Sequence, residues 1–148
     1  RILYPLLPKT SGALTLEERD TLLYASALAG MTIAQSGTTA VHGMGYSLTY
    51  FYNIDHGRAN GLLLGATLRL CEKKGVPVLQ EILSACGDTL DGVCATLDAL
   101  LGEREAIPAE RLEEFAAAVS EKHIKKSKYE PTAEEVRVIF FTSLRPQK

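Results

Sequence analysis

Two histidines in the segment Val41–Gly65 are the residues of this sequence whose types and spacing best suit chemistry. His42 and His56 lie 14 residues apart, and each is followed by a glycine. Neutral imidazoles are common ligands of divalent iron and zinc, so the pair is a candidate metal site. Two ligands are an incomplete set, because a catalytic metal has at least three protein ligands. From the residues alone, a purely structural role for both histidines stays open.

Tyr46 is the third candidate in this segment. It follows His42 by four residues, so both side chains project from the same face of a helix. Asp55 is the nearest carboxylate, but its position before His56 favours a role as the N-cap of the next helix. Further metal ligands would therefore come from outside the segment.

Helices are expected to position these residues. One is expected over Ala40–Tyr52, and after a turn at Asn53–Asp55 a second over His56–Lys74. A capping box at Thr15–Glu18 opens a helix of about twenty residues. Its small contact face predicts a buried, central position.

The rest of the chain predicts more helices and no sustained strand pattern. They are expected over 77–85, 90–101, 108–124 and, after a capping box at Thr132–Glu135, through Leu144. The basic tract Lys122–Lys128 is interpreted as a solvated helix end rather than a phosphate site. The predicted fold class is all-α, with about seven helices.

Composition excludes several classes of function. A net charge of −2 over 148 residues gives no basic footprint for nucleic acid. No apolar run approaches the length of a membrane span. The three cysteines, Cys71, Cys86 and Cys94, include no CxxC pair, which favours reduced thiols in a cytoplasmic protein. The chain opens with Arg1, and the simplest interpretation is a piece of a longer protein.

The stretch HGMGYSLTYFYNIDHGRANGLLL resembles the metal-binding segment of the iron-containing (group III) alcohol dehydrogenases. In that family an HxxxH element precedes an HG pair and a run of leucines. The resemblance extends back to Leu14 and forward to about Leu70, and more loosely over the C-terminal helices. It implies that residues 15–148 are the helical metal-binding domain and that residues 1–14 lead in from a missing N-terminal domain.

The resemblance also implies a mechanism. The family binds Fe²⁺, or in some members Zn²⁺, through an aspartate and three histidines, and the last two histidines match His42 and His56. The other two ligands lie further upstream than the 41 residues before His42, as does the domain that binds NAD or NADP. The metal polarises an alcohol or carbonyl oxygen during hydride transfer. We therefore expect the fragment alone to be inactive and to expose a patch near the histidines that favours self-association.

Tyr46 is a departure from the family pattern, because many members have a histidine there. Its hydroxyl can orient a substrate oxygen, and we assign it a second-layer or proton-relay role. Tyr50 and Phe51 either line the substrate side or pack in the core. Lys128–Pro131 replaces an Asn-Pro-Arg-like element of the family.

Two alternatives to an iron-type dehydrogenase remain. One keeps the fold with other chemistry, as in glycerol dehydrogenases, maleylacetate reductases or dehydroquinate synthases. The other is a non-catalytic helical module that binds a partner through its Tyr/Phe-rich stretch. The upstream aspartate and histidine would separate the first alternative from an iron-type dehydrogenase. Replacing both histidines with alanine would separate the second, since a module would keep its partner affinity and an intact dehydrogenase would lose metal and turnover.

Overall fold

The two helices that carry the candidate residues form where the sequence predicts them. In the computed structural model, which describes residues 1–147, α2 spans Ala40–Tyr52 and α3 spans His56–Lys73. Asn53 ends α2 in the left-handed conformation, with φ at 51°. Asp55 then accepts hydrogen bonds from the amides of Gly57 and Arg58, which confirms its role as the N-cap of α3. This short turn lays α3 back against α2.

The all-α class is confirmed, with eight α-helices and one 3-10 helix among the described residues where about seven helices were expected. None of these helices is both long enough and apolar enough to cross a membrane. The other elements are η1 (Tyr4–Ser11), α1 (Leu16–Ser36), α4 (Val78–Cys86), α5 (Leu90–Leu101), β1 (Ala106–Pro108), α6 (Ala109–Ala118), α7 (Glu121–Lys125), α8 (Ala133–Ser143) and β2 (Arg145–Gln147).

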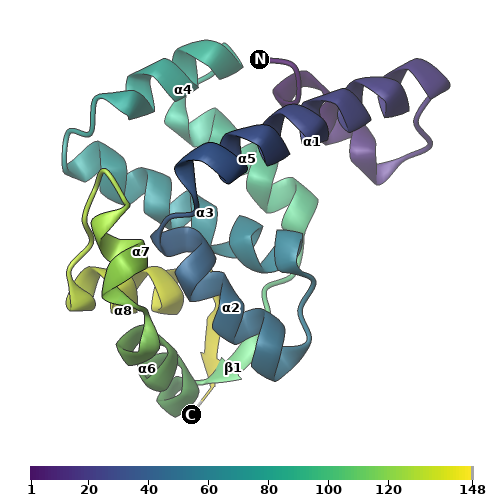
Figure 1. Cartoon of the computed structure of the whole chain (residues 1–148). Helices are drawn as coiled ribbons and strands as arrows, with labels where there is room; N and C mark the ends of the chain where they lie inside the picture. The colour runs from purple at the N-terminus through teal and green to yellow at the C-terminus, as the bar shows by residue number, and fades with distance from the viewer. Residues whose placement is uncertain (148) are drawn as a thin grey trace.

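Helix α3 lies at the centre of the molecule and packs against α2, α5 and α8 (Figure 1). Met44 and Leu48 of α2 and Leu63 of α3 are fully buried in the shared core. Burying one such side chain stabilises the fold by about 1.5–3 kcal/mol. The core continues into α6 and α8 through Phe115 and Phe140, whose ring centres lie 6.3 Å apart.

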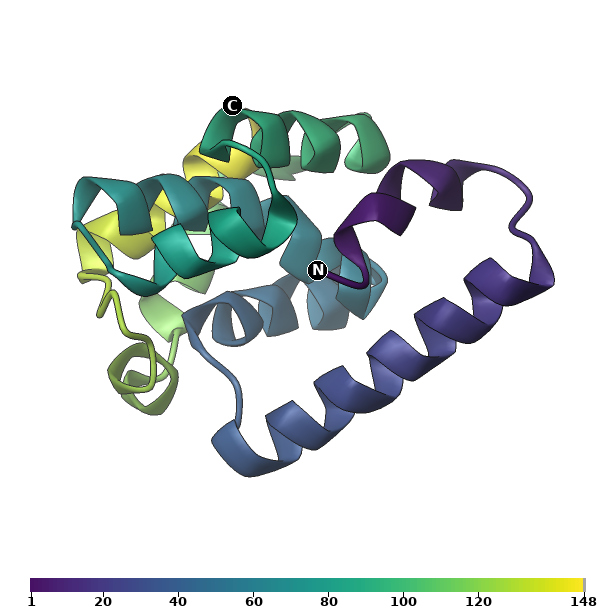
Figure 2. The ribbon, with the colours of Figure 1, turned by 90° about the horizontal axis from the view of Figure 1, so that it is seen from above.

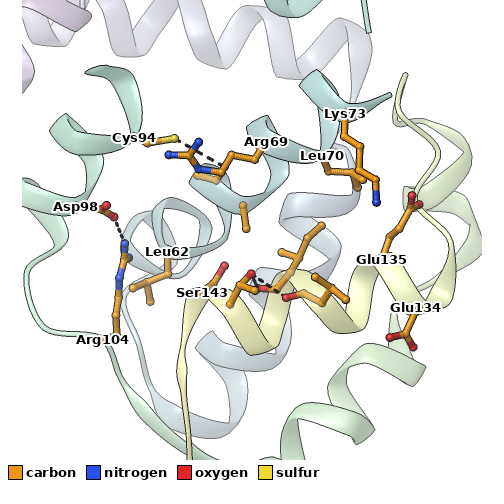
Figure 3. Close-up of a pocket in the computed structure, with 15 residues that line it drawn as sticks. Leu62, Arg69, Leu70, Lys73, Cys94, Asp98, Arg104, Glu134, Glu135 and Ser143 are labelled. Atoms are coloured by element: carbon orange, nitrogen blue, oxygen red, sulfur yellow. Dashed lines mark hydrogen bonds and ion pairs between the residues drawn. The ribbon is translucent and has the colours of Figure 1, made fainter. Parts of the chain in front are cut away.

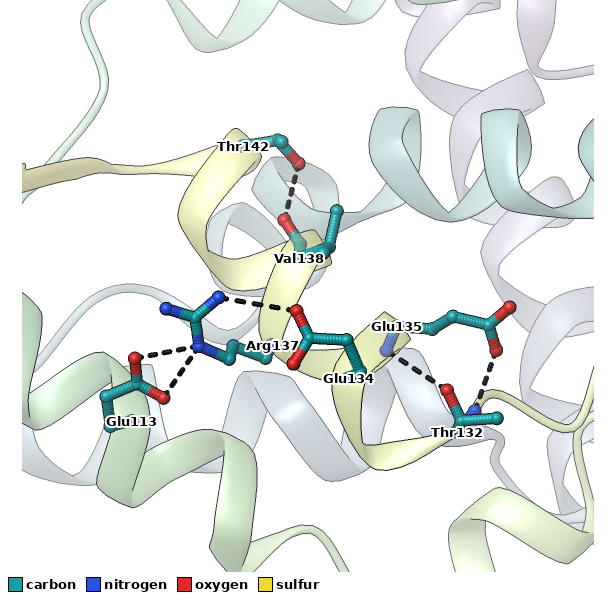
Figure 4. Close-up of polar contacts among 7 residues, drawn as sticks. All are labelled: Glu113, Thr132, Glu134, Glu135, Arg137, Val138 and Thr142. Atoms are coloured by element: carbon teal, nitrogen blue, oxygen red, sulfur yellow. Dashed lines mark hydrogen bonds and ion pairs between the residues drawn. The ribbon is translucent and has the colours of Figure 1, made fainter.

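The last helix begins at the capping box that the sequence predicts. Thr132 Oγ1 accepts from the amide of Glu135, and the Glu135 carboxylate accepts from the amide of Thr132 (Figure 4). Arg137 of α8 then reaches Glu113 of α6, with Nε donating at 2.8 Å. Both partners are exposed, so this pair adds less than about 1 kcal/mol and chiefly fixes orientation.

Helix α1 does not occupy the central, buried position predicted for it. No residue of α1 is buried, and Leu23 is 71% exposed. The helix lies to one side of the bundle, and only residues such as Leu22, Ala25 and Leu28 are partly covered (Figure 2). A face of alanine, serine and glycine hides little apolar area, so its burial adds little stability. Periodicity identified a contact face but not a partner for it.

Three further elements differ from expectation. The lead-in of residues 1–14 contains the 3-10 helix η1, which holds Pro5 and Pro8. The helix expected over 108–124 is divided into α6 and α7, because Val119 adopts an extended backbone. Strands β1 and β2 form a parallel pair that joins residues nearly forty positions apart, with Ala106 opposite Arg145. Such short, distant pairing leaves no local pattern in the sequence.

The three cysteines are free, and Cys71 and Cys94 are buried, in agreement with the expectation of unpaired thiols. Burial raises the pKa of both thiols above the ordinary value, so both are protonated at neutral pH.

Candidate metal centre

The start of α2 is fixed by a residue from the far end of the chain. Thr39 precedes the helix but makes no side-chain capping bond. The buried hydroxyl of Ser127 accepts from the amide of Ala40 at 2.8 Å, and it donates to the carbonyl of His123 at 2.9 Å. One side chain therefore gives the amide of Ala40 its hydrogen-bond acceptor and joins the first turn of α2 to α7. This contact sets the position of His42, two residues further on.

The start of α3 is fixed by Arg58. Its Nε donates to Glu105 at 2.5 Å, and its Nη1 and Nη2 donate to the carbonyls of Leu101 and Glu103 at 2.7 Å each. The guanidinium thus ties the first turn of α3 to the segment after α5. His56, two residues before Arg58, is positioned by this attachment.

The two helices bring His42 and His56 together. Their ring centres lie 5.4 Å apart, with the ring planes inclined at 59°. Two imidazoles that share one tetrahedral metal, each at a bond length of about 2 Å, have ring centres about 5 Å apart. The spacing of the pair therefore fits a shared divalent cation.

His42 has the protonation state that a metal ligand needs. Burial lowers the pKa of its imidazole below the ordinary 6.5, and the neighbouring charges of His56 and then His123 lower it further. The ring is consequently neutral at pH 7, with a lone pair available on one nitrogen.

Asn60 holds the ring of His56. Its amide nitrogen donates to Nε2 of His56 at 3.1 Å, one turn along α3, so in this arrangement Nδ1 is the ring nitrogen left for another partner. The Asn60 carbonyl oxygen is buried and has no hydrogen-bond partner among the described residues. Gly45 of α2 allows this close approach, because a Cβ there would lie 2.3 Å from that oxygen. The sequence analysis did not single out Asn60.

Tyr46 lies against the ring of His56. Its ring stacks on His56 at 5.7 Å between centres, and the planes are inclined at only 14°. The side chain is 47% exposed, so the phenol is open to solvent beside the histidines.

His123 is the residue of this cluster that sequence reasoning missed. It was included in the basic tract expected to be a solvated helix end, whereas its ring meets Tyr46 edge to face at 5.7 Å. Nδ1 lies 2.7 Å from the hydroxyl of Ser120. A Cβ at Gly43 would lie only 3.0 Å from the His123 side chain, so that glycine leaves room for the ring. The only signal in the sequence for a role of this residue in the cluster was that it is the third histidine of the chain.

The rest of the tract is divided in character. Lys125 is exposed and pairs with Glu121, as a solvated helix end would, while Ser127 is buried.

Tyr50 is 83% exposed, and Phe51, at 56%, stacks on the buried Phe115. Neither aromatic belongs to the buried core, which leaves an exposed aromatic patch at the C-terminal end of α2.

Within residues 1–147, no group of three or more histidines, cysteines, aspartates or glutamates is arranged to hold a metal ion. Asp55 is committed to the cap of α3. The described chain therefore brings His42 and His56 together as a candidate pair, with Tyr46 and His123 close by.

The chain is similar to known proteins in both sequence and fold. Residues 7–143 match the Fe-containing alcohol dehydrogenase family, C-terminal. The fold superposes on the crystal structure of an iron-containing alcohol dehydrogenase from Thermotoga maritima with a TM-score of 0.82 and 33% identity. That match covers 97% of this chain and 39% of the Thermotoga chain.

Two 1,3-propanediol dehydrogenases, from Citrobacter freundii and Klebsiella pneumoniae, are each 33% identical over 84 residues. The matched part is 57% of this chain and 21% of each relative, so the chain corresponds to a minor part of these enzymes. Family match and fold agree: the chain belongs to the Fe-containing alcohol dehydrogenase family and corresponds to its C-terminal helical domain.

Proposed function

We propose that this chain is the metal-binding domain of an NAD(P)-dependent alcohol dehydrogenase, in which His42 and His56 are two of the metal ligands. The observation that carries the proposal is the pair of imidazoles, 5.4 Å apart on adjacent helices. The neutral state of His42 supports it, as does membership of the family. An N-terminal domain would supply the remaining aspartate and histidine and bind NAD or NADP.

The chemistry divides between the cation and the side chains of this chain. A bound Fe²⁺ or Zn²⁺ would supply positive charge that polarises the oxygen of an alcohol, aldehyde or ketone. His42 and His56 would hold that charge at the start of α2 and of α3. Tyr46 presents a hydroxyl on the open side of the same cluster, where it orients the substrate oxygen and passes a proton to solvent.

The names of two relatives make 1,3-propanediol the first alcohol to test. The chain alone is expected to be inactive, because it would contribute only half of the ligands. Iron and zinc content, together with NAD- or NADP-linked oxidation of 1,3-propanediol, tests this on the 148-residue chain. Stoichiometric metal with turnover would contradict it.

A chimera tests the function itself. Residues 7–143 replace the matching part of the Thermotoga maritima enzyme, whose fold they share. Metal-dependent oxidation is expected, and His42→Ala or His56→Ala should lower it at least about a hundredfold. Ser84→Ala, an exposed position on α4, is the control that leaves the rate unchanged. Full turnover in the double histidine variant would overturn the proposal.

Two other functions are separable from this one. Related chemistry, as in glycerol dehydrogenases, maleylacetate reductases or dehydroquinate synthases, would appear as a different substrate in the chimera. A non-catalytic interaction module would use the exposed Tyr50 and Phe51 and keep its partner without the histidines. We place the protein in the cytoplasm on its three free thiols, and expect the exposed aromatic patch to promote self-association.

A further inference from the structure

The loop between α7 and α8 supplies the hydroxyl that caps α2, but the loop itself contains an unfavourable turn. Ser127 lies in this loop and accepts from the amide of Ala40. In the turn 127–130 the amide of Glu130 donates to the carbonyl of Ser127 at 2.9 Å, and Glu130 adopts a φ of 33°. That conformation is unfavourable for a residue with a side chain, so contacts from outside the turn must hold it.

Lys74, directly after the last residue of α3, supplies those contacts. Its Nζ donates to the carbonyl of Tyr129 at 2.9 Å and to that of Glu130 at 3.0 Å. The same ammonium pairs with the carboxylate of Glu135 at 2.7 Å. Three acceptors match the three hydrogens of a lysine ammonium. Only 26% of the side chain is exposed, so water competes with these bonds less than at an open surface.

Glu135 is a fixed anchor for this ammonium. Its carboxylate also accepts from the amide of Thr132 in the capping box that begins α8. Lys74 therefore joins the end of α3, the turn 127–130 and the start of α8. The preceding lysine, Lys73, instead lines the pocket between α3, α5 and α8 (Figure 3).

The turn held by Lys74 connects to both candidate ligands. Helix α3 begins with His56 and runs to the residue before Lys74. Helix α2 begins where Ser127 holds Ala40, and it carries His42 two residues further on. The contacts of Lys74 therefore fix the start of α2 relative to α3, and with it the separation of the two histidine rings.

We propose that Lys74 is a positioning residue for the candidate metal site, acting on His42 through the turn 127–130. Without the ammonium, the turn relaxes, Ser127 moves away from Ala40, and the first turn of α2 loosens. His42 then no longer stays at a fixed distance from His56. The effect on the metal rests on the proposed function, whereas the loosening of α2 does not.

Amide hydrogen exchange of the 148-residue chain tests the loosening. In Lys74→Met the amide of Ala40 should exchange at least about tenfold faster than in the wild type. The amide of Ala59, which donates to the carbonyl of Asp55 at the start of α3, should keep its rate and report that the fold is intact. Lys73→Met removes the same charge one residue earlier and should leave both rates unchanged. Equal acceleration at Ala40 and Ala59, or none at Ala40, would overturn the proposal.

The chimera with the Thermotoga maritima enzyme tests the effect on the metal. Lys74→Met should weaken metal binding at least about tenfold, excess metal should restore turnover, and the KM for the nicotinamide cofactor should not change. Metal affinity equal to that of Lys73→Met would contradict the role of Lys74 even if His42→Ala abolishes turnover. Turnover that survives His42→Ala would instead refute the metal site and leave the exchange result of Lys74→Met standing.

Discussion

The hydroxyl of Ser127 accepts a hydrogen bond from the backbone amide of Ala40, across 87 positions of sequence. This bond provides the cap that α2 lacks locally, and the helix it begins carries His42 and Tyr46. The C-terminal third of the chain therefore takes part in placing the candidate metal ligands.

Ser127→Ala is expected to lower the free energy of unfolding by about 1–2 kcal/mol, because it leaves the amide of Ala40 buried without an acceptor. Urea unfolding followed by circular dichroism measures the loss. Ser36→Ala, at an exposed position near the end of α1, is the control and should change stability by less than about 0.5 kcal/mol. Equal stability of the two variants would show that Ser127 does not cap α2.

Gly45→Ala should destabilise the chain by about 1–3 kcal/mol, since the new Cβ would lie 2.3 Å from the Asn60 carbonyl oxygen. The displaced amide would also release the ring of His56. Thermal unfolding gives the stability, and the ring proton shifts of His56 report the lost contact.

Gly30→Ala is the matched control for this substitution. Gly30 lies within α1, and a Cβ there would meet nothing within 4 Å. Alanine at that position should stabilise the helix by about 0.5–1 kcal/mol. Because the two substitutions should change stability in opposite directions, they separate helix propensity from close packing. A Gly45→Ala chain as stable as Gly30→Ala would rule out the close approach of α2 and α3.

Local signals in the sequence were sufficient to predict α2, α3 and the capping box of α8. The glycine-punctuated histidine segment and the Asp55 cap are encoded within a few residues, and they form as predicted. The site could be predicted only as far as this segment extends. His123 and Ser127 reach it from a distant basic tract, and no periodicity links them to His42.

The placement of α1 failed for a different reason. A pattern of small residues predicts a helix that another element can approach closely, but it carries no information on which element that is. Strands β1 and β2 were missed because a three-residue parallel pair depends on contacts between distant segments.

The stability of the chain should fall as the pH drops through about 6.5, and His42 should contribute to the fall. Burial and the charges of His56 and His123 lower the pKa of His42 in the folded chain, so the unfolded state binds more protons in this range. The contribution is fully present above the unfolded pKa and is lost as the pH falls through the folded one.

Urea unfolding of the wild type and of His42→Asn, at about pH 8 and about pH 5.5, measures this contribution. The wild type should lose more stability on acidification than the variant, which keeps His56 and His123. An identical loss in both proteins would show that His42 is not held in its neutral form by the fold.

Titration of the 148-residue chain with Zn²⁺ tests most directly whether His42 and His56 face a single cation. Ring proton shifts of both histidines should move together, with one ion bound weakly per chain. His42→Ala and His56→Ala should each lower the affinity at least about tenfold, and the double variant should lose little more. His123→Gln should still bind Zn²⁺ through the remaining pair. Two independent binding events, or losses in the single variants that simply add, would contradict a shared metal site.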